Sequence, residues 1–279
     1  MSRMTADLHE AVIVIAREAG QAIMAVYEHA FDVHQKSDDS PLTAADLAAH
    51  RVIAEGLQRL TPQWPVLSEE AADIAWSERS QWPTYWLVDP LDGTREFIKR
   101  NGEFTVNIAL IEHNEPIFGV VHAPVTGETW HARQGRNAYR RVGEVDTLLR
   151  TRAPANGTLK VAASRSHRDA RTQAFLDRMG AIEEVALGSS LKFCRIAEGT
   201  LDVYPRFGPT SEWDTAAAQC VLEAAGGALL APDGRSFRYN RRDTLLNGDF
   251  VALGDMTLPW RRWLEESHDG TGHGYARQA

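Results

Sequence analysis

The stretch Tyr85-Trp-Leu-Val-Asp89-Pro-Leu-Asp-Gly-Thr94 joins an apolar run to a turn that is rich in oxygen-bearing groups. The apolar run predicts a buried β-strand, and we expect the strand to stop at Pro90 because proline cannot donate to a sheet ladder. Gly93 permits backbone conformations that residues with a Cβ atom resist. The turn can therefore direct several oxygen ligands into one small volume: the carboxylates of Asp89 and Asp92, the carbonyl of Leu91 and the hydroxyl of Thr94.

Two other acidic positions stand at the predicted ends of secondary-structure elements. Glu69 and Glu70 follow a short strand at 64–67, and Asp214 stands where a helix begins. Adjacent like charges are costly unless they are solvated or neutralised by a cation. Simpler interpretations are an ordinary Asp-Gly turn, a solvated acidic loop and a helix N-cap. In a chain without the spacing of His and Cys metal ligands, the three positions together favour an oxygen-only Mg²⁺ site.

Outside these segments, the pattern predicts a mixed α and β protein in which helices cover sheets. Apolar residues at three- and four-residue intervals predict a helix at Leu8–Tyr27. A polar loop is expected at 35–41, followed by a helix at 44–60 with Thr43 as its N-cap and Asp46 in an imperfect capping box. Further strands are expected at 104–111, 117–122, 161–164 and 201–204, the last closed by Pro205. Further helices are expected at 169–179, 190–199 and 215–225, the last followed by Gly226-Gly227, which suits a left-handed exit.

The composition narrows the class of protein. With 279 residues, 43% of them apolar, and 8 Trp, the chain can bury the core of one or two domains. These values exclude a disordered or collagenous chain. Acids outnumber bases 38 to 30, which argues against a nucleic acid as the partner. A small anionic ligand remains compatible with this charge if bound cations or a local basic pocket reverse its sign.

Three further features bear on location. The two cysteines, Cys194 and Cys220, favour a reducing compartment. No run of about 18 apolar residues is present to span a membrane, and the first residues lead into a helix rather than a signal-peptide core. We therefore expect a cytoplasmic protein, with peripheral association at the inner membrane face left open. Residues 266–279 are rich in Gly and His without periodicity, so we expect a disordered tail there.

The acidic motifs resemble a known family. Asp89-Pro-Leu-Asp-Gly-Thr94, with Glu69-Glu70 upstream and Trp213-Asp214 downstream, resembles the inositol monophosphatase superfamily of lithium-sensitive, Mg²⁺-dependent phosphatases. The likeness extends from the first helix to about Phe250. Within that superfamily, the chain is most similar to the bacterial 3'(2'),5'-bisphosphate nucleotidase branch, which is linked to sulfate assimilation. The segments that carry this second resemblance are 92–97, 188–194, 204–209 and 212–215. Two small departures are Arg95, where Lys is often seen, and Ala218, where a Gly is usual.

The resemblance implies a fold and a metal site. The implied fold is the layered α-β-α-β-α sandwich of inositol monophosphatase and fructose-1,6-bisphosphatase, with an N-terminal metal-binding half at 1–150 and a C-terminal nucleotide-binding half at 151–265. Two or three Mg²⁺ ions are implied. One would be held by Glu69, Asp89 and the Leu91 carbonyl, and a second by Asp89, Asp92 and Asp214. Glu69 and Thr94 would position the attacking water, and Asp46 would activate water or hold a third ion unless it is only a helix-capping acid.

The resemblance also implies how substrate is held. The backbone of Gly93 and Thr94 would contact the scissile phosphate, together with the metal-binding groups of Glu69, Leu91, Asp92 and Asp214. The adenosine and its second phosphate would be bound by His167, Ser189, Lys192 and Arg206. Arginine suits phosphate through its planar donor fork, and lysine acts as a compact charge. The simpler interpretations are that Lys192 is a solvated helix residue and that His167 belongs to a turn.

The activity implied by the resemblance is removal of the 3'-phosphate from adenosine 3',5'-bisphosphate, which gives AMP. Two metal ions about 3.5–4 Å apart can lower the pKa of water and neutralise the phosphoryl oxygens. One alternative is a phosphatase of inositol or another small monophosphate, with the same metals and a different pocket. The other is a nucleotide-binding sensor without turnover, against which the intact acidic set argues. The partner in each case is a small molecule, and the oligomeric state is left open.

Overall fold

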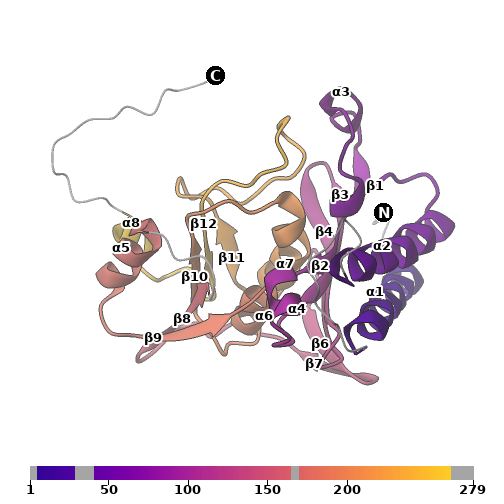
Figure 1. The fold of residues 1–279 in the computed structure, drawn as a ribbon. Coiled ribbons are helices and arrows are strands. Elements are labelled where there is room, and N and C mark those ends of the chain that lie inside the picture. Colours follow the sequence, from indigo (N-terminus) through magenta and orange to yellow (C-terminus); the bar gives the residue numbers. More distant parts are fainter. Residues whose placement is uncertain (1–4, 29–40, 165–169, 265–279) are drawn as a thin grey trace.

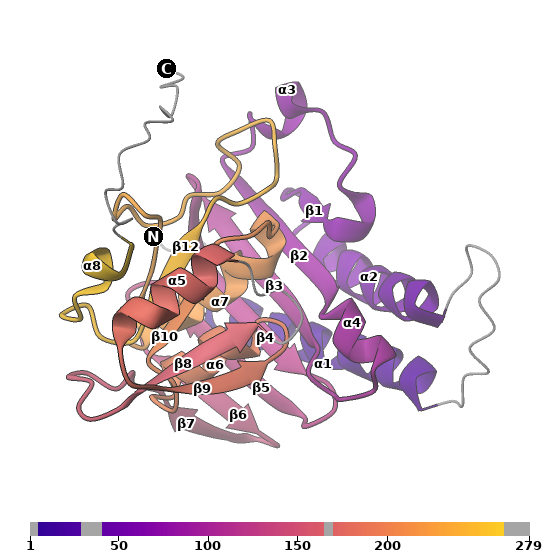
Figure 2. The same cartoon turned by 60° about the vertical axis from the view of Figure 1, so that its left-hand side comes forward.

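The structure is a computed structural model that describes residues 5–28, 41–164 and 170–264. Five layers follow one another across the molecule (Figure 1). Helices α1 and α2 cover one face of a seven-stranded sheet, and α6 and α7 lie between this sheet and a five-stranded sheet. Helices α5 and α8 cover the outer face of the second sheet, where Figure 2 shows α5 in front. The predicted α-β-α-β-α sandwich is confirmed.

The first layer consists of α1 (Ala6–Tyr27) and α2 (Pro41–Leu60). The apolar faces of both helices are buried against the first sheet, which explains the periodicity of the sequence. The predicted N-cap at Thr43 is wrong, because α2 already begins at Pro41, and proline is well suited to a first helical turn. The predicted loop before Pro41 lies outside the described residues.

The seven-stranded sheet has the order β1 to β7, with β1 parallel to β2 and every later pair antiparallel. Its strands are β1 (Val66–Ser68), β2 (Thr84–Asp92), β3 (Thr105–Glu112), β4 (Glu115–Ala123), β5 (Glu128–Arg133), β6 (Ala138–Val142) and β7 (Val145–Leu148). The predicted stop at Pro90 is wrong. Strand β2 continues to Asp92, and a register shift between Asp89 and Asp92 accommodates the proline, which has no N–H to donate.

The second sheet has the order β11-β12-β10-β8-β9. Its strands are β8 (Leu159–Ser164), β9 (Ile182–Leu187), β10 (Val203–Arg206), β11 (Ala228–Leu230) and β12 (Phe250–Leu253). The predicted end of a strand at Pro205 is also wrong, because Pro205 lies inside β10 opposite Val251. The remaining helical segments are η1 (Glu69–Ala71), α3 (Trp76–Arg79), α4 (Thr94–Ile98), α5 (Ala170–Met179), α6 (Leu191–Ala197), α7 (Glu212–Ala224) and α8 (Trp260–Leu264).

The central layer joins the two sheets. Helix α7 lies so close to β4 that a Cβ atom on Gly119 would come within 2.2 Å of the Ala217 carbonyl oxygen. One buried apolar cluster contains residues from both sides of position 150, including Trp130 and Val221. Cys194 and Cys220 are buried in it as free thiols. Within the described ranges, no helix is both long and apolar enough to cross a membrane.

Candidate active site

Three carboxylates converge where β2 ends and α7 begins. Asp89, Asp92 and Asp214 each offer an oxygen, and these oxygens all lie within 4.8 Å of one another. The irregular end of β2 carries the first two, and the first turn of α7 carries the third. The interpretation of Asp214 as an N-cap is wrong, because Ser211 caps α7 and its N–H donates to Asp214 Oδ2 at 2.8 Å.

Asp92 is fixed by a pair of residues that the sequence did not point to. The Ser190 N–H donates to Asp92 Oδ2 at 2.7 Å, and the Ser190 hydroxyl lies 2.8 Å from the same oxygen. Asn107 Nδ2 in turn donates to this hydroxyl at 2.9 Å. Asn107 is only 1% exposed in the middle of an apolar strand. An amide within an apolar run was the feature of the sequence that could have indicated this role, because a buried amide needs hydrogen-bond partners.

Burial and mutual repulsion disfavour the charged forms of the three carboxylates, and the charge of Lys192 offsets this only in part and only at Asp92. Burial, followed by the charges of Asp92 and Glu69, raises the pKa of Asp89 well above its usual range. Burial and then Asp92 raise the pKa of Asp214 to about 7. Burial also raises the pKa of Asp92, although Lys192 and Ser190 oppose that shift. An all-oxygen donor set with like charges this close together fits a hard divalent cation, which would remove the repulsion.

Glu69 and Asp46 approach the same region from other elements. Partial burial of the Glu69 carboxyl group, followed by the charges of Asp92 and Glu70, raises its pKa to about 7, although Asp89 and Trp213 oppose this shift. Asp46 is 7% exposed, and burial followed by Glu70 and Glu69 raises its pKa to about 8. The interpretation of Asp46 as a capping acid is wrong, because it lies in the second turn of α2.

The residues between the acids shape the turn. The Leu91 N–H donates to Asp89 Oδ1 at 3.0 Å, and the Leu91 side chain is buried in the core, so the carbonyl is the group it can offer. Gly93 has φ 98°, and a Cβ atom there would stand 3.0 Å from the Glu103 carbonyl oxygen. Thr94 follows as the first residue of α4. Gly93 and Thr94 both line the cavity beside the carboxylates.

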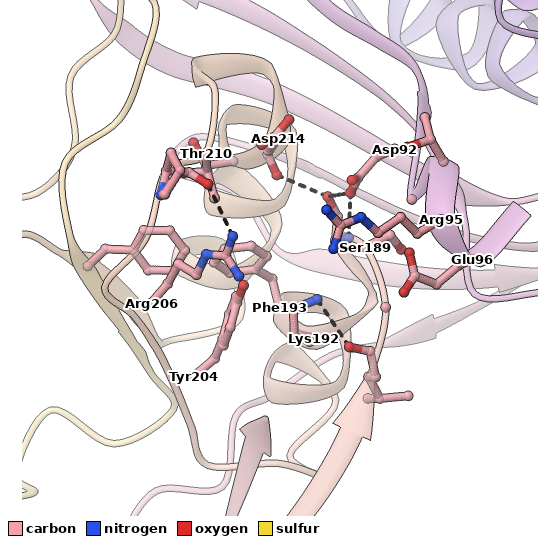
Figure 3. A pocket seen from close by; sticks show the side chains of 18 residues that line it. Asp92, Arg95, Glu96, Ser189, Lys192, Phe193, Tyr204, Arg206, Thr210 and Asp214 are labelled. Atoms are coloured by element: carbon pink, nitrogen blue, oxygen red, sulfur yellow. Dashed lines mark hydrogen bonds between the residues drawn. The ribbon is translucent and has the colours of Figure 1, made fainter. Parts of the chain in front are cut away.

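This cavity has a volume of about 250 Å³ and runs from the carboxylates to a cationic end (Figure 3). Lys192 is 6% exposed, with Nζ 3.3 Å from the Leu187 carbonyl oxygen and 5.1 Å from the Tyr204 ring centre. The interpretation of Lys192 as a solvated residue is therefore wrong. Burial lowers the pKa of Lys192 to about 8, although Asp92 opposes the shift.

Two more of the predicted substrate contacts line the same cavity. Arg206 donates from Nη2 to the Pro209 carbonyl at 3.1 Å, and Ser189 has a left-handed backbone with φ 45°. His167 lies outside the described residues. The site thus combines an acidic end suited to divalent cations with a cationic end suited to an anion, an arrangement that can hold a ligand with separated negative groups.

Comparison with known proteins finds one matching family and relatives that share one name. The model of the inositol monophosphatase family matches residues 5–262. The 3'(2'),5'-bisphosphate nucleotidase CysQ of Escherichia coli (strain K12) is 51% identical over 241 residues, which cover 86% of this chain and 96% of that protein. CysQ of Haemophilus influenzae is 36% identical over 263 residues, covering 94% and 98%.

A solved structure agrees with both the fold and the sequence comparison. The crystal structure of CysQ from Bacteroides thetaiotaomicron, described as a bacterial member of the inositol monophosphatase family, aligns with a TM-score of 0.81 at 39% identity. The alignment covers 88% of this chain and 97% of that one. With a family match over nearly the whole chain and relatives of this identity, the chain belongs to the inositol monophosphatase family.

Proposed function

We propose that this chain is a 3'(2'),5'-bisphosphate nucleotidase that hydrolyses the 3'-phosphate of adenosine 3',5'-bisphosphate to give AMP and phosphate. The observation that carries the proposal is the cavity itself, which has carboxylates at one end and Lys192 and Arg206 at the other. A substrate with two phosphate groups would place one at each end. The CysQ relatives carry the same activity in their name.

The proposed cofactor is Mg²⁺, bound as two or three ions. Glu69, Asp89 and the Leu91 carbonyl would hold one ion, and Asp89 would share a second with Asp92 and Asp214. When bound, Mg²⁺ supplies Lewis-acid polarisation of the phosphate and a lowered pKa for the attacking water. Asp46 lies within electrostatic reach of Glu69 and Glu70 and would activate water or hold a third ion.

The protein's own groups would orient the reactants. Glu69 and Thr94 would fix the attacking water, and the Gly93 and Thr94 backbone would hold the phosphate that is lost. Lys192 and Arg206 would hold the phosphate that stays, with Ser189 beside them. Because Lys192 is enclosed, its interaction with an anion is less screened than that of a surface lysine.

The direct test is phosphate release from a panel of adenosine 3',5'-bisphosphate, inositol 1-phosphate and fructose 1,6-bisphosphate, with and without Mg²⁺. We expect Mg²⁺-dependent release from the adenosine bisphosphate at a kcat/KM at least about tenfold above the others, since one charge-assisted contact contributes roughly 1.5–3 kcal/mol. Faster hydrolysis of inositol 1-phosphate would instead support the monophosphatase alternative. Tight nucleotide binding without phosphate release would support the sensor.

A further inference from the structure

Residues 239–247 wrap the start of the helix that carries Asp214. We call this segment the strap. The Asn240 N–H donates to Glu212 Oε2 at 2.8 Å, and the Glu212 N–H donates to the Leu245 carbonyl at 2.9 Å. Asn247 Nδ2 donates to the Ser211 carbonyl at 2.7 Å. Since Glu212 is fully buried, the strap fixes the first turn of α7 on its inner side.

The other side of the strap is tied to the segment between Glu69 and β2. Figures 1 and 2 both show the strap beside α3, which ends at Arg79. Arg79 Nη1 donates to Asn240 Oδ1 at 2.6 Å, and Asn240 Nδ2 donates back to the Arg79 carbonyl at 2.6 Å. The same guanidinium group donates to the carbonyls of Arg242 and Asp243 and stands over the Trp76 ring.

Arg79 is an unusual residue to bury. It is 2% exposed, and its hydrogen-bond acceptors are an amide oxygen and backbone carbonyls. In the part of the chain that the structure describes, no carboxylate lies within 4.0 Å of it. The charge of Arg79 favours the ionised form of the buried Glu212 from beyond that distance, and Asn240 is hydrogen-bonded to both residues. Burying a cation without a directly paired anion costs free energy, so a role in geometry explains Arg79 better than a contribution to stability does.

We infer that Arg79 and Asn240 are positioning residues for the metal site, which set the distance between the segment bearing Glu69 and the helix bearing Asp214. The inference rests on the proposed metal-binding role of those two acids. The oxygens of Asp89, Asp92 and Asp214 lie within 4.8 Å of one another, so their like charges oppose this arrangement until a cation binds, and a contact outside the site would help to hold the two segments in place. The reciprocal pair of hydrogen bonds between Arg79 and Asn240 supplies that contact.

Asn240→Gly tests this with a minimal change. Asn240 has φ 53°, which glycine adopts without strain, and the backbone N–H to Glu212 is retained. Only the side-chain bonds to Arg79 are lost. We expect Mn²⁺, measured by electron paramagnetic resonance titration of the full chain, to bind about tenfold more weakly. This is the lower end of the loss that follows removal of a direct partner of a metal ligand, because Asn240 acts through Arg79 and Glu212.

Asn114→Gly is the matched control. Asn114 also has a left-handed backbone, with φ 67°, and its Nδ2 donates to the carbonyls of Tyr239 and Asn240 at 2.7 and 3.1 Å. It anchors the same strap to the turn between β3 and β4 instead of to α3. We expect a similar loss of melting temperature in this variant, with Mn²⁺ affinity within about threefold of wild type.

Arg79→Lys provides a second, independent measurement, because it keeps the charge and loses the forked donor geometry. It should weaken Mn²⁺ binding in the same way as Asn240→Gly. Unchanged Mn²⁺ affinity in either folded variant would overturn the inference, as would equal weakening by Asn114→Gly, which would indicate general loosening. If the variants bind Mn²⁺ more weakly than the wild-type protein as expected, but the wild-type protein leaves adenosine 3',5'-bisphosphate intact, the positioning role stands and the proposed substrate fails.

Discussion

Two clusters of ionisable side chains place the same kinds of residue in opposite electrostatic environments. One is the acidic site at the end of β2. The other, which we call the clasp, lies where α1 meets the last strands of the first sheet and consists of His9, Glu10, His131, Arg141 and Asp146. In the clasp, hydrogen bonds from Arg141 lower the pKa of Asp146 to about 2. In the site, burial and Asp92 raise the pKa of Asp214 to about 7.

The difference comes from the nearest cation. Arg141 donates from Nε and Nη2 to the two oxygens of Asp146 at 2.8 and 2.9 Å, and it also bonds to Glu10. Asp89 has other carboxylates around it instead. A carboxylate whose pKa is lowered in the folded state stabilises the fold at neutral pH. A carboxylate whose pKa is raised destabilises the fold as pH rises from its usual pKa to the raised value. The site is therefore a destabilising region of the metal-free fold, which a bound cation would relieve.

The largest expected effect comes from replacing a carboxylate of the site by a neutral amide, which is then compared with the same replacement in the clasp. Asp92→Asn should lower turnover of adenosine 3',5'-bisphosphate by about a hundred- to a thousandfold, because several kcal/mol of charge stabilisation depend on the ion that Asp92 would hold. Its metal-free melting temperature should be at least that of wild type, since one repelling charge is gone. Both are measured on the purified variant, with saturating Mg²⁺ for turnover.

Asp146→Asn is the matched substitution in the clasp. It should lower the melting temperature and leave turnover within about threefold, because it lies in a structural ion cluster whose partners are Arg141 and His131. If Asp92→Asn turns over at a wild-type rate, the assignment of Asp92 to the metal is wrong.

A smaller effect should separate the two ends of the cavity. Lys192→Met retains most of the aliphatic stem and removes the charge, and Arg206→Met does the same at the cavity rim. Each should lower kcat/KM for adenosine 3',5'-bisphosphate by about ten- to a hundredfold, since a charge-assisted hydrogen bond contributes roughly 1.5–3 kcal/mol. Hydrolysis of a small monophosphate should change little. Equal losses on both substrates would show that these cations do not hold a second phosphate.

Much of the fold could be predicted because it depends on local pattern. The periodic faces of α1 and α7 and the apolar runs of β2 and β3 are visible in the sequence, and their ends differ from the prediction by a few residues. Strands β5 to β7, β9, β11 and β12 were missed. In β5 and β6 the reason is mixed polar residues such as Glu128 and Arg140, whose partners are supplied by other elements. The predicted strand ends at Pro90 and Pro205 were wrong because the neighbouring strand decides whether a sheet accepts a proline.

Glu69, Asp89, Asp92 and Asp214 could be predicted because each stands at or near the end of an element, a position that is local in sequence. The residues that hold these acids in place could not be predicted from the sequence. Ser190 and Asn107 reach Asp92 across 98 and 15 positions, and Arg79 meets Asn240 across 161. Such pairs depend on the register of distant elements, and no spacing within a single sequence indicates them. The roles assigned to the substrate-binding residues, and the division into halves at residue 150, remain predictions.

Mg²⁺ should stabilise the protein, and the two clusters should respond differently to it. At about a hundred times the dissociation constant, binding to the folded state adds roughly 2.7 kcal/mol, or about 5 °C in melting temperature for a chain of this size. Asp214→Asn should lose this shift. Asp146→Asn should keep it in full from a lower starting temperature. A full shift in Asp214→Asn, measured by differential scanning calorimetry, would exclude Asp214 as a ligand.

The smallest expected effect is a loss of fold stability at acid pH that arises in the clasp. The geometry of the clasp shows which histidine nitrogens carry a proton. Since His131 Nε2 lies 3.0 Å from Asp146 Oδ1, that nitrogen carries a proton, and its neutral Nδ1 accepts from His9 Nε2, also at 3.0 Å. Burial, followed by His131 and Arg133, lowers the pKa of His9 to about 4. The unfolded chain therefore gains a proton near pH 6.5 that the folded chain refuses until about pH 4. Stability is present above the first value and is lost as pH falls toward the second.

His9→Gln isolates this effect, because the glutamine amide can still donate to His131 but does not titrate. Between pH 7 and pH 5 in metal-free buffer, the melting temperature of wild type should fall by up to about 4 °C more than that of His9→Gln, since a pKa shift of one unit corresponds to about 1.4 kcal/mol. His122, whose pKa burial lowers to about 4, and the acids of the site titrate in both proteins, so they cancel in the difference. Parallel pH profiles for the two proteins would mean that His9 is already solvated, and the clasp would then hold α1 through Glu10 and Arg141 alone.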